Sequence, residues 1–253
     1  MEKKFIVFIV FIFVLSYGYG EKKKIVIAAA TNLNTVLSEI KKDFEDSNKD
    51  ITVEIIFGAS GKLATQIKEG APFDIFMSAD TIFPEMLYKD FFCESAPKVY
   101  ASGKLVIFTA LNLDLKRGID ILKDNNIKLI SIANPETAPY GTATVEALRK
   151  YGIFEDIKDK IVRSETLSQV IHQVITSSDV GITAMSLMFS KDMQKYEKNI
   201  NWSEINPDLY KKMDQAIIIL KQSKNKESSK LLYNYIFSAY AKEIFKKYGY
   251  DVN

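Results

Sequence analysis

Four short turns in the sequence combine small or hydroxyl-bearing residues with the expected start of a helix. They are AAATNLN (residues 28–34), FGASGKLA (57–64), NPETAPYGTA (134–143) and SETLSQV (164–170). The first amides of a helix have no partner within the helix, and the positive end of the helix dipole lies beside them. Turns of this kind can therefore hold an anion. Arginine and lysine are largely missing from them, so neutral groups are expected to bind that anion.

The turn FGASGKLATQ, residues 57–66, lies between an expected strand and an expected helix, where phosphate-binding loops occur. The P-loop pattern fails here, because only two residues separate Gly58 from Gly61 and a leucine follows the lysine. Ser60 is expected to cap the helix, and Gly61 permits a ligand to approach the backbone closely. Lys62 is expected on the solvated face of that helix. The turn therefore predicts an anion site built from Ser60 and backbone amides.

The other three turns offer comparable donors. Thr31 and Asn32 end an apolar run and are suitable N-cap residues for the helix that follows. Pro139 suits the first position of a helix, which leaves the amide of Tyr140 and that of the next glycine without helical partners. In the last turn a threonine and a glutamine have capping-box spacing, so the amide of Leu167 opens a helix.

Composition and charge narrow the class of protein. The chain has 253 residues, 47% of them hydrophobic and 26% charged, which is typical of a globular protein with one large or two modest domains. Without residues 1–20 it carries 32 basic and 31 acidic residues, so its net charge indicates neither nucleic acid nor an acidic membrane as a partner. Cys93 is the single cysteine, which excludes an internal disulfide.

Residues 1–20 have the layout of a signal peptide. Two lysines precede an apolar run from Phe5 to Leu15, which is shorter than the roughly 20 residues of a membrane-spanning helix. Cleavage is expected after Gly20, and an uncleaved anchor is the alternative. No cysteine stands at the cleavage site to carry a lipid. We therefore expect an exported protein of a bacterial periplasm, without a lipid anchor.

From residue 24 onward, β-branched runs alternate with amphipathic stretches. This repeated order of strand and helix predicts the α/β class, with mainly parallel sheets flanked by helices. The expected strands are residues 24–30, 51–57, 73–79, 104–110, 128–134, 180–184 and 216–220. The expected helices are residues 33–46, 61–70, 81–90, 143–152, 167–177 and 228–249.

Two of the strand-like runs, Lys104–Thr109 and Gln215–Leu220, can divide the chain into two lobes. We expect a first lobe of residues 21–103, a second lobe of residues 104–217, and a return of residues 218–253 to the first lobe. A single continuous sheet is the alternative, which the alternation does not exclude. In a two-lobed protein, the ligand is expected in the cleft, beyond the carboxyl ends of the strands.

Six segments of the chain match a known family in sequence and in order. They are AAATNL, FGASGKLATQI, GAPFDIFMSAD (residues 70–80), NPETAPYG, SETLSQV and EIFKKYGY. They span nearly the whole mature chain, which thereby resembles the periplasmic molybdate- or tungstate-binding proteins of ABC importers. The resemblance implies a two-lobed periplasmic-binding-protein fold of type II with two hinge crossings. It also implies lobes that close over a tetrahedral oxyanion, which then passes to a membrane permease and its ATPase.

Carried over residue by residue, the resemblance implies an oxyanion-binding shell of Thr31, Asn32, Ser60, Tyr140 and Leu167. Thr31 and Ser60 would donate hydroxyl and backbone hydrogen bonds from the first lobe. Tyr140 and Leu167 would donate mainly backbone N–H groups from the second lobe. We expect a monomer without a cofactor, in which molybdenum or tungsten is bound as an oxyanion and has no direct protein ligand.

The position of Tyr140 departs from the pattern of many members of the family. Those members have alanine at this place in the turn and a ligand-binding tyrosine on a later strand, where this chain has Ala184. This chain therefore resembles a variant of the family in which the tyrosine stands in the turn. The sequence does not separate molybdate from tungstate, and sulfate, phosphate and a small organic acid remain alternative ligands.

A hydrolase and a structural or interaction protein are the alternatives from other classes of protein. A hydrolase would need a nucleophile beside His172, the single histidine, and none is evident; Cys93 is flanked by aromatic residues and is expected to pack in the core. The carboxylates Glu85, Asp90 and Glu94 indicate a solvated helix face rather than a metal site. A structural or interaction protein without a ligand is the third alternative.

Overall fold

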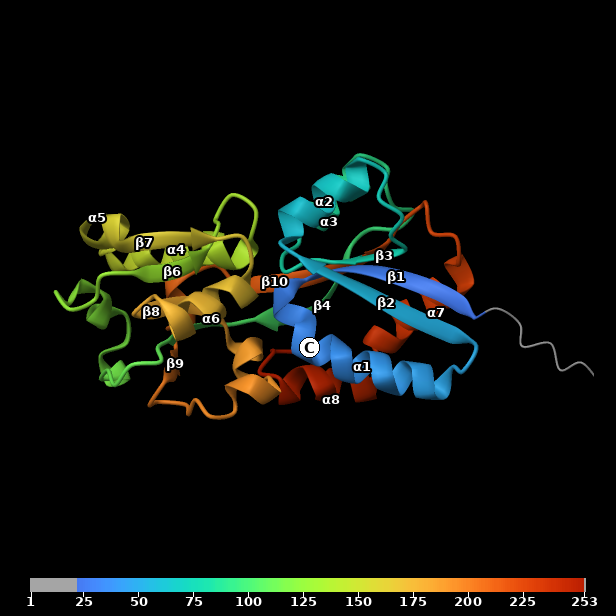
Figure 1. Cartoon of the computed structure of the whole chain (residues 1–253). Coiled ribbons are helices and arrows are strands. Elements are labelled where there is room, and N and C mark those ends of the chain that lie inside the picture. The colour runs from blue at the N-terminus through green and yellow to red at the C-terminus, as the bar shows by residue number, and fades with distance from the viewer. Residues whose placement is uncertain (1–21, 253) are drawn as a thin grey trace, which may run out of the picture.

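The computed structural model describes residues 22–252, which form two lobes, each built on a five-stranded sheet (Figure 1). The predicted signal peptide at residues 1–20 lies outside the described residues. Within those described, no helix is both long and apolar enough to cross a membrane. The predicted two-lobed α/β architecture is therefore present in the part of the chain that the structure describes.

The first lobe contains a mixed sheet. Strand β1 (Lys23–Ala30) lies between β2 (Ile51–Gly58) and β3 (Ile75–Met77), and all three are parallel. Strand β10 (Met213–Ile219) pairs antiparallel with β3 and with the edge strand β4 (Lys98–Gly103). The sequence of strands across the sheet is therefore β2-β1-β3-β10-β4, with β10 returning from the far end of the chain.

Helices cover both faces of the first sheet (Figure 1). Helices α2 (Ser60–Lys68) and α3 (Ile82–Lys89) lie on one face. Helices α1 (Asn34–Ser47), α7 (Lys226–Ile236) and α8 (Ala239–Lys247) lie on the other. Strands covered on both faces bury side chains in both directions, which explains why the runs in β1 and β3 are apolar without alternation.

The second lobe repeats this plan. Strand β6 (Ile130–Ala133) lies between β7 (Ile161–Ser164) and β8 (Val180–Ala184), all parallel. Strand β5 (Leu105–Phe108) pairs antiparallel with β8 and with the edge strand β9 (Trp202–Glu204). Every residue of β5, β6 and β8 is buried, as the apolar sequence of these strands requires. The helices of this lobe are α4 (Pro139–Tyr151), α5 (Phe154–Ile157) and α6 (Leu167–Thr176).

The chain crosses between the two sheets twice. Lys104 alone separates β4 from β5, and residues 205–212 connect β9 to β10. The backbone N–H of Leu105 donates to the Tyr210 hydroxyl at 3.1 Å, so the two crossings are tied together. The predicted lobe boundaries at residues 103/104 and 217/218 remain a prediction; the second of them falls within β10, which pairs with strands of the first sheet.

Several expected elements need correction. The single long helix expected at residues 228–249 is wrong, because the chain breaks into α7 and α8. The break is stabilised by Ser238, whose Oγ accepts a hydrogen bond from the Ala241 amide at 3.1 Å and caps α8. The short strands β4, β7 and β9 were not expected, since β4 mixes polar and apolar residues and β7 and β9 have only four and three residues.

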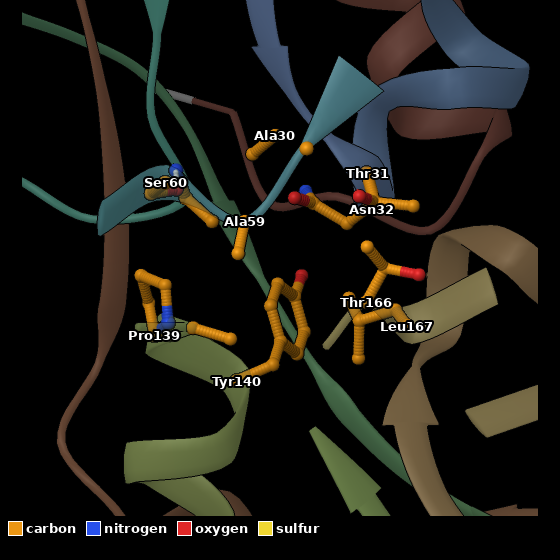
Figure 2. A pocket seen from close by; sticks show the side chains of 12 residues that line it. Ala30, Thr31, Asn32, Ala59, Ser60, Pro139, Tyr140, Thr166 and Leu167 are labelled. Atoms are coloured by element: carbon orange, nitrogen blue, oxygen red, sulfur yellow. Dashed lines mark hydrogen bonds between the residues drawn. The ribbon is translucent and has the colours of Figure 1, made fainter. Parts of the chain in front are cut away.

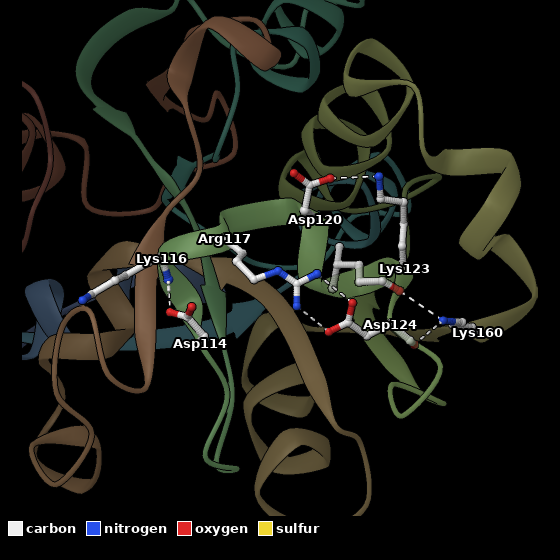
Figure 3. A network of polar contacts seen from close by, with 8 residues as sticks. Asp114, Lys116, Arg117, Asp120, Lys123, Asp124 and Lys160 are labelled. Atoms are coloured by element: carbon white, nitrogen blue, oxygen red, sulfur yellow. Dashed lines mark hydrogen bonds and ion pairs between the residues drawn. The ribbon is translucent and has the colours of Figure 1, made fainter.

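Charged residues at the outer edge of the second lobe pair with one another (Figure 3). Arg117 makes a bidentate ion pair with Asp124, at 2.7 and 2.8 Å. Lys123 pairs with Asp120 at 2.9 Å, and Lys160 donates to the Asp124 carbonyl at 2.9 Å. These contacts hold the irregular 3-10 segment Leu115–Lys123 in place. They therefore explain this charge cluster without a ligand.

Candidate functional site

A pocket lies between the two lobes, where turns from both sheets converge (Figure 2). Its walls are neutral: among the described residues that line it there is no Asp, Glu, Lys, Arg or His. The space open to the centre of a water molecule is ≈ 10 Å³, about that of one water. The lining residues are Ala30, Thr31, Asn32, Gly58, Ala59, Ser60, Ala79, Ala138, Pro139, Tyr140, Thr166 and Leu167.

The structure brings all five residues of the predicted shell together around this pocket. Each lies just beyond the carboxyl end of a parallel strand. Thr31 and Asn32 follow β1, Ser60 follows β2, Tyr140 follows β6, and Leu167 follows β7. The position agrees with the general rule that ligands of α/β sheets bind at these strand ends. That these residues bind an oxyanion remains a prediction.

Thr31 contributes a buried hydroxyl to the pocket. Thr31, Asn32 and Leu33 form a 3-10 turn capped by the Ala30 position, and no side chain makes a capping hydrogen bond. The prediction that Thr31 or Asn32 caps the next helix is therefore wrong. The Thr31 Oγ1 atom is buried and has no hydrogen-bond partner among residues 22–252. A buried hydroxyl without a partner is costly unless a ligand or water satisfies it.

Asn32 is fully buried, and its backbone and side chain tie the pocket to other elements. Its carbonyl oxygen accepts from the Ser186 hydroxyl at 2.8 Å. Its side-chain amide lies 2.9 Å from the Gln215 amide and 2.8 Å from the Tyr250 hydroxyl. One atom of the Asn32 amide has no partner among the described residues. Figure 2 shows this end of the side chain directed into the pocket.

Ser60 is the first residue of α2 rather than its cap, which is Ala59, so the predicted capping role is wrong. The Ser60 Oγ accepts a hydrogen bond from the Ala79 amide at 3.0 Å. Since a hydroxyl has one proton and the protein supplies Ser60 with a donor, that proton remains available to a ligand. The Ser60 side chain is thus arranged as a donor.

Tyr140 stands at the start of α4, with Pro139 in the first helical position as predicted. The amide of Gly141 donates to the Ala138 carbonyl at 2.8 Å, so the prediction that this amide is free is wrong. The Tyr140 ring rises into the pocket (Figure 2), and its hydroxyl lies 3.2 Å from the Gln215 amide. Burial raises the pKa of the Tyr140 phenol well above its ordinary value, which keeps it neutral.

Leu167 is the first residue of α6. The predicted capping box is confirmed, because the Thr166 hydroxyl accepts from the Gln169 amide and the Gln169 side chain accepts from the Thr166 amide. The box satisfies neighbouring amides and leaves the Leu167 amide open. In the described part of the chain, no protein acceptor is found for the amides of Ser60, Tyr140 or Leu167. The pocket therefore offers unpaired amides from both lobes.

Gly61 and Lys62 connect the lobes instead of facing the pocket. The Gly61 amide donates to the Thr137 carbonyl at 2.9 Å, and a Cβ at Gly61 would lie 3.0 Å from that oxygen. The close approach that Gly61 permits is thus to the second lobe and not, as predicted, to a ligand. Lys62 is half-exposed as expected and forms an ion pair with Glu165 at 2.6 Å.

The residues considered for catalysis lie away from the pocket. His172 is exposed on α6. Burial raises the pKa of the Cys93 thiol to about 11, which makes it a poor nucleophile at neutral pH. Glu94 is paired with Lys226 at 2.6 Å. No group of three or more His, Cys, Asp or Glu residues within 22–252 is placed to hold a metal ion.

Sequence reasoning missed Gln215, Tyr100 and Tyr250, which lie behind the pocket. The Gln215 side chain contacts Asn32, Tyr100 and Tyr140, and it is fully buried. A signal was available in the sequence, because the polar residue Gln215 directly precedes the apolar run AIII of strand β10. Buried polar side chains need specific partners, so such an exception points to a hydrogen-bonded network.

Comparisons with known proteins extend over both lobes and the pocket. The family model for bacterial extracellular solute-binding proteins matches residues 25–251. The molybdate-binding protein ModA of Azotobacter vinelandii is 34% identical over 238 residues, which cover 92% of each chain. ModA of Rhodobacter capsulatus is 31% identical over 229 residues, which cover 90% of this chain and 88% of the relative. The solved structure of the A. vinelandii periplasmic molybdate-binding protein has a TM-score of 0.83 and 26% identity, and the match covers 90% of this chain and 99% of that one.

Proposed function

The chain belongs to the bacterial extracellular solute-binding proteins, and from this membership we propose that it captures molybdate or tungstate in the pocket between its lobes. The bound oxyanion is then delivered to the membrane permease of an ABC importer, whose ATPase drives transport. Two relatives that are named molybdate-binding proteins, each more than 30% identical, support this choice of ligand. The family resemblance and the two-lobed fold expected from the sequence are confirmed.

The observation that carries the proposal is the neutral, donor-rich wall of the pocket. Unpaired amides come from Ser60, Tyr140 and Leu167, and hydroxyl protons come from Thr31 and Ser60. All three amides lie in the first turn of a helix, where the helix dipole favours negative charge. A dianion can therefore be bound without a counter-charged side chain.

The number of donors is sufficient for tight binding. Five charge-assisted hydrogen bonds, one from each of these donors, contribute on the order of 8–15 kcal/mol at roughly 1.5–3 kcal/mol each. Association costs offset about 4–15 kcal/mol of that gain. At the favourable end of these ranges the remainder exceeds about 8 kcal/mol, which corresponds to micromolar or tighter affinity. Because the enclosed space is about that of one water, the walls must separate slightly to admit an oxyanion, and the two crossings provide a hinge.

A shell of donors also selects for protonation state. Molybdate, tungstate and sulfate are fully deprotonated at neutral pH and accept from every donor. Phosphate carries a proton and needs an acceptor in the shell. Between molybdate and sulfate, the size of the closed cavity makes the distinction.

The proposal extends to the cellular setting. We infer that residues 1–20 direct export and are removed, that the mature protein is a periplasmic monomer, and that it has no cofactor, nucleic-acid partner or catalytic activity. The lobe division at residues 103/104 and 217/218 belongs to the same proposal. The shell is again Thr31, Asn32, Ser60, Tyr140 and Leu167.

Calorimetric titration of the mature protein with molybdate, tungstate, sulfate and phosphate tests the proposed ligand. We expect micromolar or tighter binding of molybdate and tungstate at one site per chain, and much weaker binding of sulfate and phosphate. Preferential binding of sulfate or phosphate would show that the proposed ligand is wrong and that the protein binds that oxyanion instead. The absence of binding by all four would refute an oxyanion site.

A further inference from the structure

A buried hydrogen-bonded network lies directly behind the pocket and joins residues of both lobes. At its centre is Gln215 on β10, which is not among the residues that line the pocket. One end of the Gln215 amide lies 3.2 Å from the Tyr140 hydroxyl. The other end lies 2.9 Å from the Asn32 amide and 3.0 Å from the Tyr100 hydroxyl. The network therefore links Asn32, which reaches the pocket from the first lobe, to Tyr140 in the second.

In the structure, the side-chain amides of Asn32 and Gln215 are oriented so that the hydrogen bonds of the network follow one order of donors and acceptors. Asn32 Nδ2 donates to Gln215 Oε1 and to Tyr250, and Gln215 Nε2 donates to Tyr140. The buried Asn32 Oδ1 is then the atom without a partner among the described residues. Its position at the pocket presents an acceptor to any ligand. For a dianion, whose oxygens are also acceptors, this contact is repulsive.

The opposite order uses the same heavy-atom positions. If both amides turn by 180°, Gln215 Nε2 donates to Asn32 Oδ1 and to Tyr100, while the Tyr140 phenol donates to Gln215 Oε1. Distances do not distinguish amide oxygen from nitrogen, so only the hydrogen-bond partners decide the order. The atom of Asn32 that faces the pocket is now Nδ2, a donor.

Both orders leave one tyrosine hydroxyl of the network in the same situation. In the first, the single proton of Tyr100 lies between the Gln215 oxygen and the Ser78 carbonyl, which is 2.9 Å away. In the second, the single proton of Tyr250 lies between Asn32 Oδ1 and the Asn32 carbonyl, at 2.8 and 2.9 Å. In each order, one hydroxyl faces two acceptors with one proton. In either order one atom of the Asn32 amide also lacks a partner within the described residues, so a ligand beside Asn32 shifts the equilibrium between the two orders.

Tight packing around Gln215 favours reversal of its amide over displacement of its side chain. A Cβ at Gly103 would lie 2.1 Å from the Tyr140 hydroxyl and 2.5 Å from the Gln215 amide nitrogen. These atoms thus fill the space beside β4, and a closely packed interior resists displacement of side chains. An exchange of nitrogen and oxygen in place needs little extra room.

Resting on the proposed oxyanion function, we propose that Gln215 is a positioning residue whose amide reverses together with that of Asn32, so that Asn32 Nδ2 donates to the bound oxyanion. In this state the phenol of Tyr140 donates to Gln215, and Tyr140 reaches the ligand through its backbone amide. Gln215 thereby decides whether the Asn32 position offers a donor or an acceptor. This choice sets the preference for a fully deprotonated oxyanion over a protonated one.

Gln215→Glu tests this coupling, because a carboxylate accepts at both ends. It draws Asn32 Nδ2 toward itself and turns Asn32 Oδ1 to the pocket. We expect Gln215→Glu to weaken molybdate binding by at least tenfold. Gln215→Glu is also made in an Asn32→Leu background, which separates this effect from simple charge repulsion. Without Asn32, the loss of molybdate affinity caused by Gln215→Glu should be severalfold smaller. Equal costs of Gln215→Glu in both backgrounds would overturn the proposal.

A spectroscopic measurement on the unmodified protein covers the case in which the variants fold poorly. With selectively labelled glutamine and tyrosine, the molybdate-bound protein should show nuclear Overhauser contacts from the Gln215 NH₂ protons to the Tyr100 ring. Contacts to the Tyr140 ring in the bound state would overturn the proposal. Failure of the unmodified protein to bind any of the four oxyanions would instead refute the proposed function, so the two failures are distinguishable.

Discussion

Lys62 Nζ lies 2.6 Å from Glu165 Oε1, and the pair joins the two lobes across the edge of the pocket. Lys62 is two residues from Ser60 on α2, and Glu165 is two residues from Leu167 at the start of α6. Beside them, the Gly61 amide donates to the Thr137 carbonyl at 2.9 Å. Both contacts hold the lobes in the closed arrangement, in which the predicted shell surrounds a single pocket.

Lys62→Met should speed release of the ligand without removing a contact to it. Both side chains are about half-exposed, so the pair is worth about 0.2–1 kcal/mol and the dissociation rate should rise no more than about fivefold. The effect should shrink in high salt, since salt screens exposed charges. Lys68→Met is the matched control, because Lys68 on the same helix pairs with Asp90 within the first lobe. Stopped-flow dissociation measures both; equal effects of the two variants would argue against an inter-lobe role.

Ser60→Ala should weaken binding and also lower the stability of the protein. The lost hydroxyl removes a charge-assisted hydrogen bond of about 1.5–3 kcal/mol, which is about 10- to 150-fold in affinity. The Ala79 amide loses its acceptor as well, which costs about 1–3 kcal/mol of unfolding free energy. Calorimetric titration and urea unfolding measure the two effects. Ser38→Ala, at an exposed serine of α1, should change neither, and unchanged affinity in Ser60→Ala would remove Ser60 from the shell.

The pocket was predictable from the sequence because its polar residues follow strands. Thr31 and Ser60 come after β-branched runs that form neighbouring parallel strands, and the carboxyl ends of parallel strands meet at one edge of a sheet. The capping box at Thr166 was also readable, because its spacing is local. The ends of these strands and the capping box, which local sequence determines, were therefore predictable.

The network behind the pocket was not predictable, because it depends on contacts between distant parts of the chain. Asn32 meets Gln215 and Tyr250 across separations of 183 and 218 residues. Likewise, local sequence gives Lys62 a solvated position but does not identify Glu165 as its partner. The break at Ser238 escaped notice because apolar residues continue with helical spacing on both sides of it. Tertiary packing decides all of these features.

Buried tyrosines should make the protein sensitive to alkaline pH. Burial raises the pKa of Tyr100, Tyr140 and Tyr250 above the ordinary value of 10.0. In the unfolded chain these phenols release their protons near that value, whereas in the folded protein they keep them. Above about pH 10 the unfolded state therefore binds fewer protons than the folded state, and the free energy of unfolding falls. The slope is up to about 1.4 kcal/mol per pH unit for each phenol, whereas below about pH 9 these phenols leave the free energy of unfolding constant. Urea unfolding between about pH 8 and 11 measures this slope, which should be less steep in Tyr250→Phe; an unchanged slope would contradict the assignment.

Leu167→Pro should remove a single backbone donor while preserving the helix that carries it. Leu167 is the first residue of α6, where proline is well tolerated, and the preceding Thr166 has the extended conformation, φ −133° and ψ 159°, that proline requires of its neighbour. The loss of one charge-assisted hydrogen bond should weaken molybdate binding by about 10- to 150-fold, with a nearly unchanged melting temperature. Leu167→Ala keeps the amide and controls for the lost side chain, so its affinity should stay close to that of the unmodified protein. If the proline variant binds as tightly as the alanine variant in calorimetric titration, the Leu167 amide does not contact the ligand and the second lobe must hold the oxyanion through Tyr140 alone.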